Sequence, residues 1–393
     1  MMLMKTRLIS VIQAIILLAV FSCQKKSAEV TSKLPLDWEA LSDKIIERSQ
    51  VQPGERVIMI ALPGDFDPLV QLLSEKFPER GAEFLGTISV DSLSWPNSWK
   101  TDFIRSTMAG PKEDQWKLLD HIDLGIMLPG ATPMHAPYAT LQDALRQGVG
   151  RTIHFHWSGA FDFSVKPLAM DDEKNVLYQK SILETDYSKL SKYQFAFDSA
   201  LRTDWIIVTT PKGTNLRFKI GDRPVTKQDG DASFGRTGSA RNLIDREIEL
   251  PAGVVRVAPL EETVEGVIAL PDAQWSGQQV EGLVITFKEG LITDIKAGKG
   301  LDAVEAEIVN GGLAAESFRE FALGFNPLLA IPEGGLWIPH YGYGAGVVRL
   351  SLGNNQELGG SVSQGTYSRN NFFTDATVMI GKDVWVKDGK LIK

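Results

Sequence analysis

An unbroken run of six apolar residues, 57–62, constrains the fold more than any other feature of the chain. Such a run is typical of a strand that is buried on both faces of a parallel sheet. Asp67 and Pro68 follow a short loop, and we interpret them as the N-cap and the first residue of a helix that continues over 69–77. Further strand and helix units alternate up to about residue 201. The pattern predicts an α/β domain with a mostly parallel, doubly wound sheet over residues 34–203.

The pattern changes near residue 204, where short strands and tight turns replace the alternating units. Residues 211–214 (Pro-Lys-Gly-Thr) join two strands and predict a hairpin. We expect one helical stretch in this half, covering 301–309 and 314–322. The second half is therefore predicted to be an α+β domain with antiparallel strands, over residues 204–393.

The N-terminus resembles a bacterial lipoprotein signal peptide. Lys5 and Arg7 precede an uncharged apolar segment over residues 8–21, which ends in Val-Phe-Ser-Cys at 20–23. The resemblance implies cleavage of residues 1–22, lipidation of Cys23 and a polar tether over 23–33. The partner would then be a lipid bilayer, and Gln24 after the cysteine favours the outer membrane of the bacterial cell envelope. A plain secretory signal, or a buried helix with an incidental cysteine, is the alternative.

Composition excludes several classes of function. The chain of 393 residues carries 41 Lys and Arg against 49 Asp and Glu, a net charge of −8, which argues against nucleic acid as a partner. Cys23 is the only cysteine, so an intramolecular disulfide and a cysteine-rich zinc site are excluded. Phosphate-loop and serine-hydrolase motifs are also missing from the sequence.

Histidines supply two candidate features. His154 and His156 alternate on a predicted strand, so they share one face and could contribute to a zinc site. Because no third ligand lies nearby in the sequence, we favour a hydrogen-bonded pair at a strand end. His340 lies in an aromatic, glycine-rich loop over 337–344, of the kind that often lines a ligand pocket.

Several segments of the second half carry recognisable motifs in a fixed order. They are Thr-Thr-Pro-Lys-Gly-Thr-Asn-Leu at 209–216, Leu-Pro-Ala-Gly-Val at 250–254, Val-Glu-Gly-Leu at 280–283, Glu-Phe-Ala-Leu-Gly at 320–324, Arg-Leu-Ser-Leu-Gly at 349–353 and Val-Trp-Val-Lys-Asp-Gly at 384–389. As a set, they resemble the thermophilic-aminopeptidase family of metallopeptidases, the aminopeptidase T and aminopeptidase S type. The resemblance is strong over 204–393 and weaker over 34–203.

The resemblance implies a site in which two divalent metals, such as zinc, cobalt or manganese, activate water for peptide hydrolysis. The chain departs from the family's ligand pattern at most positions. Glu320 matches a metal ligand, and Glu333 is the candidate for the general base, although its spacing to the Arg349 strand is longer than in the family. The other ligand positions are occupied by Val254, Arg349, Thr374 and Ala376.

These substitutions predict that the positions of the family's metal ligands have a different role in this chain. Valine offers no lone pair, and arginine cannot lose its proton in a protein. Arg349 is instead expected to form an ion pair with Glu320, while the alternative for Glu320 is a solvated carboxylate at a helix end. No cofactor is expected under this hypothesis.

The sequence leaves three hypotheses for function. The first is a lipid-anchored, catalytically degenerate relative of the two-metal aminopeptidases that acts as a binding or interaction module for an unknown peptide or protein, with a possible pocket at Arg349, His340 and Asp375. The second is an active metallo-aminopeptidase with metal ligands relocated to Glu247, Glu249, His340 or Asp375. The third is a different hydrolase with a rebuilt pocket. The resemblance also implies a possible homodimer.

Overall fold

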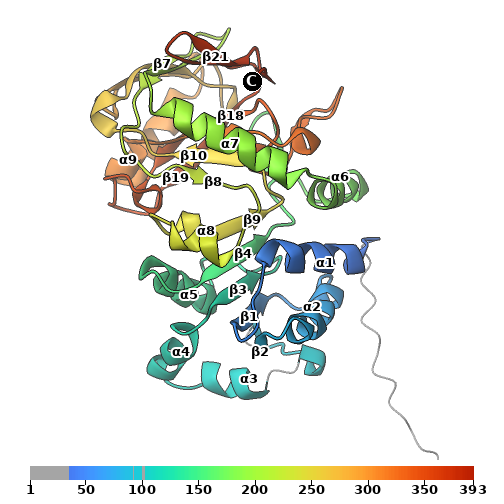
Figure 1. Cartoon of the computed structure of the whole chain (residues 1–393). Helices are drawn as coiled ribbons and strands as arrows, with labels where there is room; N and C mark the ends of the chain where they lie inside the picture. The colour runs from blue at the N-terminus through green and yellow to red at the C-terminus, as the bar shows by residue number, and fades with distance from the viewer. Residues whose placement is uncertain (1–34, 92, 100–101) are drawn as a thin grey trace, which may run out of the picture.

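Five parallel strands form the sheet in the lower half of Figure 1, in the order β2-β1-β3-β4-β9. The computed structural model describes residues 35–91, 93–99 and 102–393. The strands are β1 (Arg56–Ala61), β2 (Glu83–Ser89), β3 (Leu124–Met127), β4 (Arg151–Phe155) and β9 (Glu247–Leu250). The helices that accompany them are α1 (Trp38–Ser49), α2 (Asp67–Glu79), α3 (Asp102–Met108), α4 (Lys112–Leu119) and α5 (Ala136–Arg146). The prediction of a parallel α/β sheet is confirmed.

Antiparallel sheets form the upper half of the molecule (Figure 1). A five-stranded sheet runs in the order β19-β18-β16-β10-β8, with β8 (Thr226–Lys227), β10 (Val254–Val257), β16 (Phe318–Gly324), β18 (Val348–Gly353) and β19 (Ser368–Phe373). An eight-stranded sheet contains β15 (Leu291–Lys296), β14 (Val284–Lys288), β11 (Glu265–Ala269), β7 (Asn215–Phe218), β6 (Ile206–Thr209), β20 (Thr377–Ile380), β21 (Asp383–Lys387) and β22 (Lys390–Leu391). The α+β prediction for this half is also confirmed.

The remaining elements complete the fold. Two small ladders pair β12 (Ala273–Trp275) with β13 (Gln278–Val280) and β5 (Phe161–Asp162) with β17 (Trp337–Ile338). The remaining helices are α6 (Asp172–Leu183), α7 (Tyr187–Leu201), α8 (Phe234–Gly238) and α9 (Leu301–Ala315). Short 3₁₀ turns include η2 (Ile244–Arg246), η4 (Pro327–Leu329), η5 (His340–Gly342) and η6 (Gln356–Leu358). Within the described part of the chain, every helix is too short or too polar to span a bilayer.

Two predicted details are wrong. Asp67 is not the N-cap of α2; Phe66 takes that position, and the Asp67 carboxylate accepts a hydrogen bond from the Gly64 amide at 3.0 Å. The helix expected over 314–322 ends at Ala315, and Phe318–Gly324 is the strand β16. Pairing with β10 on one side and β18 on the other overrides the helical preference of the alanine-rich sequence.

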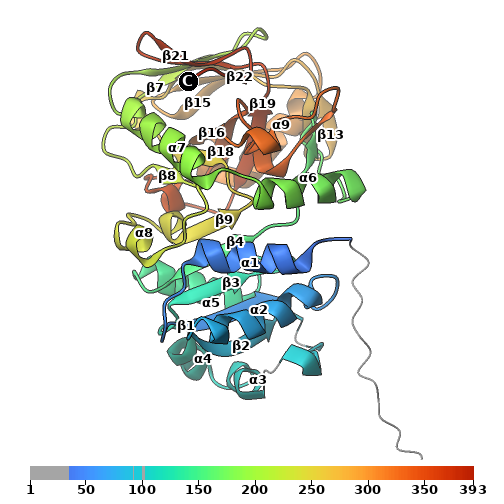
Figure 2. The ribbon, with the colours of Figure 1, turned by 45° about the vertical axis from the view of Figure 1, so that its right-hand side comes forward.

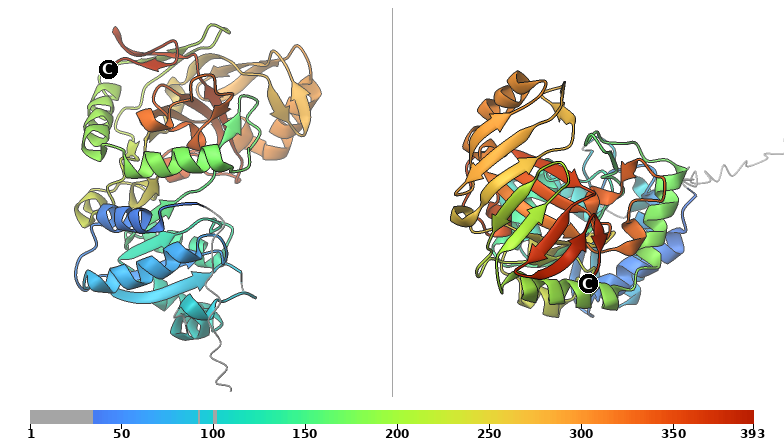
Figure 3. Two further views of the ribbon diagram at one scale, coloured as in Figure 1. Left: turned by 90° about the vertical axis from the view of Figure 1, so that its right-hand side faces the viewer. Right: turned by 90° about the horizontal axis from the view of Figure 1, so that it is seen from above.

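Two chain segments cross the boundary that the sequence predicts near residue 203, and that boundary stays a prediction. Strand β9 comes from beyond it and pairs in parallel with β4 of the first sheet. Helices α6 and α7 come from before it and lie against the antiparallel half (Figures 1 and 2). The left-hand view of Figure 3 shows the two halves of the molecule lying directly against each other.

Helix α7 joins the core of the second half through Phe197. This side chain is fully buried, and its ring lies 5.2 Å from the ring of Phe325 and 4.9 Å from that of Trp385, between centroids. One continuous hydrophobic cluster includes residues of both halves. The packing of α7 therefore helps to hold the antiparallel sheets in place.

Replacement of Phe197 by alanine should lower the free energy of unfolding by about 3–5 kcal/mol, because it leaves a cavity between α7 and the sheets. Phe195→Ala, on the same helix but 49% exposed, is the matched control and should cost less than about 1 kcal/mol. Urea denaturation measures both. Equal losses for the two variants would contradict the packing described for α7.

Candidate functional site

The site begins with the register of three neighbouring strands. Arg256 of β10 and Arg349 of β18 both pair directly with Ala322 of β16, one on each side. Directly opposed residues point to the same face of a sheet, and so does Glu320, two positions before Ala322. The small side chain of Ala322 leaves room for both arginines to reach along the sheet. This register brings two guanidinium groups to one carboxylate.

Glu320 is fully buried and each of its oxygens is held by a different arginine. Arg349 donates to Oε1 from Nε and Nη2, both at 2.9 Å. Arg256 donates to Oε2 from Nε at 3.0 Å and from Nη2 at 2.9 Å. The Ser351 hydroxyl donates to Oε1 at 3.2 Å. The predicted ion pair between Glu320 and Arg349 is confirmed, and the alternative of a solvated carboxylate at a helix end is wrong.

Charge keeps this carboxylate ionised. Burial alone would raise the pKa of Glu320, but the positive charges of Arg256 and Arg349 outweigh it and hold the pKa well below its ordinary value. Glu320 is therefore a carboxylate at neutral pH, with both oxygens engaged.

The ion pairs continue beyond Glu320. Glu357 of η6 accepts from Arg256 Nη2 at 3.4 Å and from Arg319 Nη2. We call Arg349, Glu320, Arg256, Glu357 and Arg319 the ion-pair network. It contains three cations and two anions, so it carries one excess positive charge.

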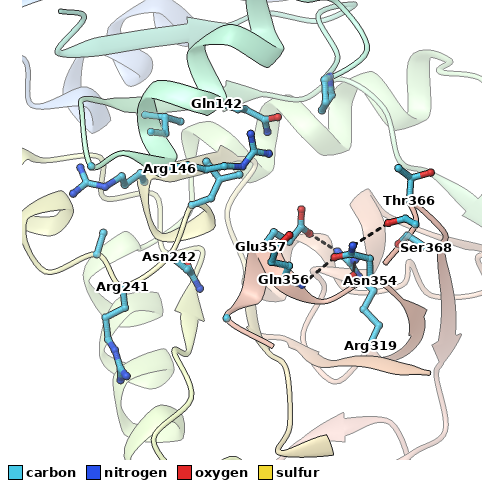
Figure 4. A pocket seen from close by; sticks show the side chains of 18 residues that line it. Gln142, Arg146, Arg241, Asn242, Arg319, Asn354, Gln356, Glu357, Thr366 and Ser368 are labelled. Atoms are coloured by element: carbon cyan, nitrogen blue, oxygen red, sulfur yellow. Dashed lines mark hydrogen bonds and ion pairs between the residues drawn. The ribbon is translucent and has the colours of Figure 1, made fainter. Parts of the chain in front are cut away.

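Arg319 and Glu357 also line a cavity of about 850 Å³. Its walls are α5 of the parallel half, the segment that leads into η2, the start of β16 and the region of η6. Figure 4 shows Gln142 and Arg146 on one side of this cavity and Arg319, Asn354 and Glu357 on another. The cavity therefore lies where the two halves of the molecule meet.

A second buried polar cluster forms where β4 pairs with β9. Both ring nitrogens of His154 lie within hydrogen-bond distance of the Tyr138 hydroxyl, at 2.9 and 2.5 Å. Its Nε2 is 3.6 Å from Oε1 of Glu247, which accepts a bond from the Gln142 amide at 2.8 Å. Burial raises the pKa of Glu247 to about 8 and lowers that of His154, so both groups are neutral at pH 7.

His340 and Glu249 both contact Tyr343, and His156 lies against His340. The Tyr343 hydroxyl donates to Glu249 Oε2, and the Tyr343 ring centroid lies 4.7 Å from that of His340. His156 stacks obliquely on His340, with ring centroids 5.9 Å apart. Burial, the largest cause, lowers the pKa of His340 to about 3, so its imidazole is neutral.

The structure separates several of the residues that the sequence placed at one site. Val254 and Ala376 are buried in the hydrophobic core, and neither side chain has a donor atom. Thr374 and Asp375 line another cavity, of about 230 Å³. Glu333 is exposed in the loop between η4 and β17.

The donor set does not fit the two divalent metals that the family resemblance implies. Among the described residues, no group of three or more His, Cys, Asp or Glu side chains could hold a metal ion. Glu320, the one matching ligand, already gives both oxygens to Arg256 and Arg349.

Comparison with known proteins supports the family resemblance over part of the chain. Residues 198–331 match the family described as thermophilic metalloprotease (M29). This segment contains Val254 and Glu320 and ends before Arg349, so it covers part of the candidate site. Among curated proteins, no match was found.

Two solved structures of similar fold extend over nearly the whole chain. 2,5-Dihydroxypyridine dioxygenase from Pseudomonas putida superposes with a TM-score of 0.62 at 15% identity, covering 91% of this chain and 98% of the other. AmpT from Thermus thermophilus gives a TM-score of 0.57 at 17% identity, covering 90% and 99%. These likenesses show the fold. Since one of the two proteins is a dioxygenase, the fold by itself does not name an activity.

Sequence motifs did not predict Arg256, Arg319 or Glu357 as site residues. A signal for Arg256 was present, because it is the one charged residue in the apolar segment 250–259. A charge in the middle of a buried strand requires a partner. Nothing in the local sequence identifies Glu357 as the link between Arg256 and Arg319.

Glu320→Gln should lower the free energy of unfolding by about 3–5 kcal/mol, because it leaves two buried arginines without their counter-charge. Urea denaturation with tryptophan fluorescence measures the loss. The matched control is Glu265→Gln, which breaks an ion pair with Arg217 in which both side chains are about half-exposed (55% and 54%). The control should leave the transition midpoint unchanged; equal shifts in both variants would contradict the account of Glu320.

Stability should fall between pH 4.5 and 8 because of Glu247. Its pKa is raised from 4.5 to about 8 on folding, so the folded state holds one proton more than the unfolded state in this range. Glu247→Gln removes that contribution. The stability of the variant relative to the parent chain should therefore rise with pH, by up to about 1.4 kcal/mol per pH unit between pH 4.5 and 8. Urea titrations at several pH values test this; a constant difference would show that Glu247 titrates normally.

Proposed function

We propose that this chain is a lipid-anchored binding protein of the bacterial cell envelope, built on the scaffold of two-metal aminopeptidases and without their catalytic centre. The observation that carries the proposal is the position of Glu320 between Arg256 and Arg349. The ion pairs occupy the one family ligand that the chain retains. Its partner would be a peptide or protein, and a homodimer is part of the proposal.

Electrostatics supports the loss of the metal centre. Two-metal hydrolysis needs both ions held a few ångströms apart with an open position for water. A divalent ion about 4 Å from a guanidinium is repelled by about 8 kcal/mol at an effective dielectric near 20, and Glu320 has two such neighbours. Neither arginine can relieve this repulsion by losing its proton.

The alternative of relocated metal ligands has less support. Glu249 and His340 both contact Tyr343, and Glu247 lies nearby on β9. Asp375 instead lines the cavity of about 230 Å³. Glu247 is protonated at neutral pH, which makes it a poor metal ligand.

The proposed membrane anchor rests on the sequence Val-Phe-Ser-Cys at 20–23, which ends the segment that resembles a lipoprotein signal peptide. This cysteine lies outside the described residues. Several acyl chains on one residue anchor a protein stably to a bilayer.

The purified mature protein should bind far fewer than two equivalents of Zn²⁺, Co²⁺ or Mn²⁺ at micromolar metal and should leave amino-acid anilides and short peptides uncut. Isothermal titration and a chromogenic peptidase assay test this. Arg349→Ala is the companion variant: it could admit a weakly bound metal and should still lack turnover. Two bound equivalents together with metal-dependent cleavage by the parent chain would refute the proposal.

Cys23→Ser should release the protein from the membrane fraction and abolish labelling by a clickable fatty acid. The physical reason is that this is the one thiol in the chain able to carry an acyl group. If the variant stays in the membrane and the parent chain takes up no label, the protein is not a lipoprotein.

A further inference from the structure

We propose that the 850 Å³ cavity between α5 and the start of β16 binds a small molecule through a carboxylate or phosphate group, with Arg246 and Arg319 as the anion-binding side chains. This inference rests on the proposed function in one respect: it gives the binding protein a small-molecule site in addition to the peptide or protein partner proposed above.

The charge of the cavity wall favours an anionic ligand. Among the described residues that line it, Arg146, Arg241, Arg246 and Arg319 face a single acid, Glu357. The chain as a whole is acidic, with a net charge of −8. Four arginines against one glutamate is therefore a strong local reversal of the overall charge. A cation-lined hollow with protein walls raises the local concentration of anions.

The four arginines differ in how far their charge is already neutralised. Arg241 donates to the exposed Asp222 side chain, and Arg146 donates to Asp143 on its own helix at 2.5 Å. Arg246 donates to the Gly150 carbonyl at 3.0 Å, and no carboxylate in the described part of the chain pairs with it.

Arg319 is also only partly neutralised. It donates to the carbonyl of Asn354 and to Glu357, but Glu357 is shared with Arg256. Both ends of the ion-pair network are therefore arginines, and Arg319 is the end that lines the cavity. Arg246 is thus the guanidinium group with no carboxylate partner among the described residues, and Arg319 is the buried one that shares its acid with Arg256.

The neutral lining fits a polar ligand that carries such a group. It provides the side-chain amides of Gln142, Asn242, Asn354 and Gln356 and the hydroxyls of Thr366 and Ser368. Amides and hydroxyls donate and accept hydrogen bonds, so they complement oxygen-rich molecules. A volume of 850 Å³ lies within the range typical of small-molecule sites and exceeds what inorganic phosphate alone would fill.

The binding geometry leaves Glu320 undisturbed. Both oxygens of Glu320 are held by Arg256 and Arg349, neither of which lines the cavity. The ligand therefore meets Arg319 at the edge of the ion-pair network, and the buried pair behind it remains intact. This places the proposed site beside the former metal position and not within it.

Isothermal titration at low ionic strength tests the proposal, with inorganic phosphate and triglutamate as the two probes and triglutamine as the neutral control. At least one anionic probe should bind saturably and triglutamine should not. Arg246→Gln should weaken binding by about tenfold or more, as expected when a charged hydrogen bond is lost. Added salt should weaken it further. The relative affinity of the two probes distinguishes a phosphate from a carboxylate ligand.

Arg217→Gln is the matched control, since this arginine lies on β7 and pairs with Glu265 on an exposed surface. It should bind the probe as the parent chain does. Arg319→Gln should also weaken binding; if that variant fails to fold, Arg246→Gln still decides the outcome. Absence of binding by both anionic probes, or equal affinity in Arg246→Gln and the parent chain, would overturn the inference.

The metal titration described above separates this inference from the proposed function. Two bound metals with peptide cleavage would remove the proposed function and leave anion binding at Arg246 standing. Absence of anion binding together with absence of metal uptake would overturn this inference and leave the proposed function standing.

Discussion

A carboxylate with no exposed surface is stable as an anion only if the protein supplies compensating charge, and Glu320 imposes this requirement on the antiparallel sheet. The strand register meets it by placing Arg256 and Arg349 on either side of Ala322. In return, the carboxylate offsets part of the cost of burying each arginine, and Glu357 is a second acid for Arg256. The three central strands of the sheet are therefore tied together by charge as well as by backbone hydrogen bonds.

The same arrangement connects the core to the surface of the cavity. Glu357 links Arg256 to Arg319, and Arg319 lines the hollow where the parallel and antiparallel halves meet. Helix α5 and the 3₁₀ turn η2 supply the opposite walls. A fold shared with AmpT thus offers, in this chain, a fixed positive charge beside a polar cavity.

Sequence reasoning reached the two halves of the fold and the Glu320–Arg349 pair, because apolar periodicity and a charge substitution at a ligand position are both local signals. It failed over 314–322, where an alanine-rich segment favours a helix but pairing on both sides makes it a strand. It also missed Arg256 and Glu357. Arg256 lies 64 residues from Glu320 in the chain, and Glu357 lies 38 residues from Arg319. The register of β16 also shifts between Phe318 and Glu320. Register of this kind depends on tertiary pairing, which no single segment encodes.

The most direct test of this account is a crystal structure of the mature protein soaked in zinc, with anomalous diffraction recorded at the zinc edge. The account predicts that Arg256 and Arg349 both remain on Glu320 and that no anomalous peak lies beside its carboxylate. A zinc peak within coordination distance of Glu320, with either arginine displaced, would contradict it.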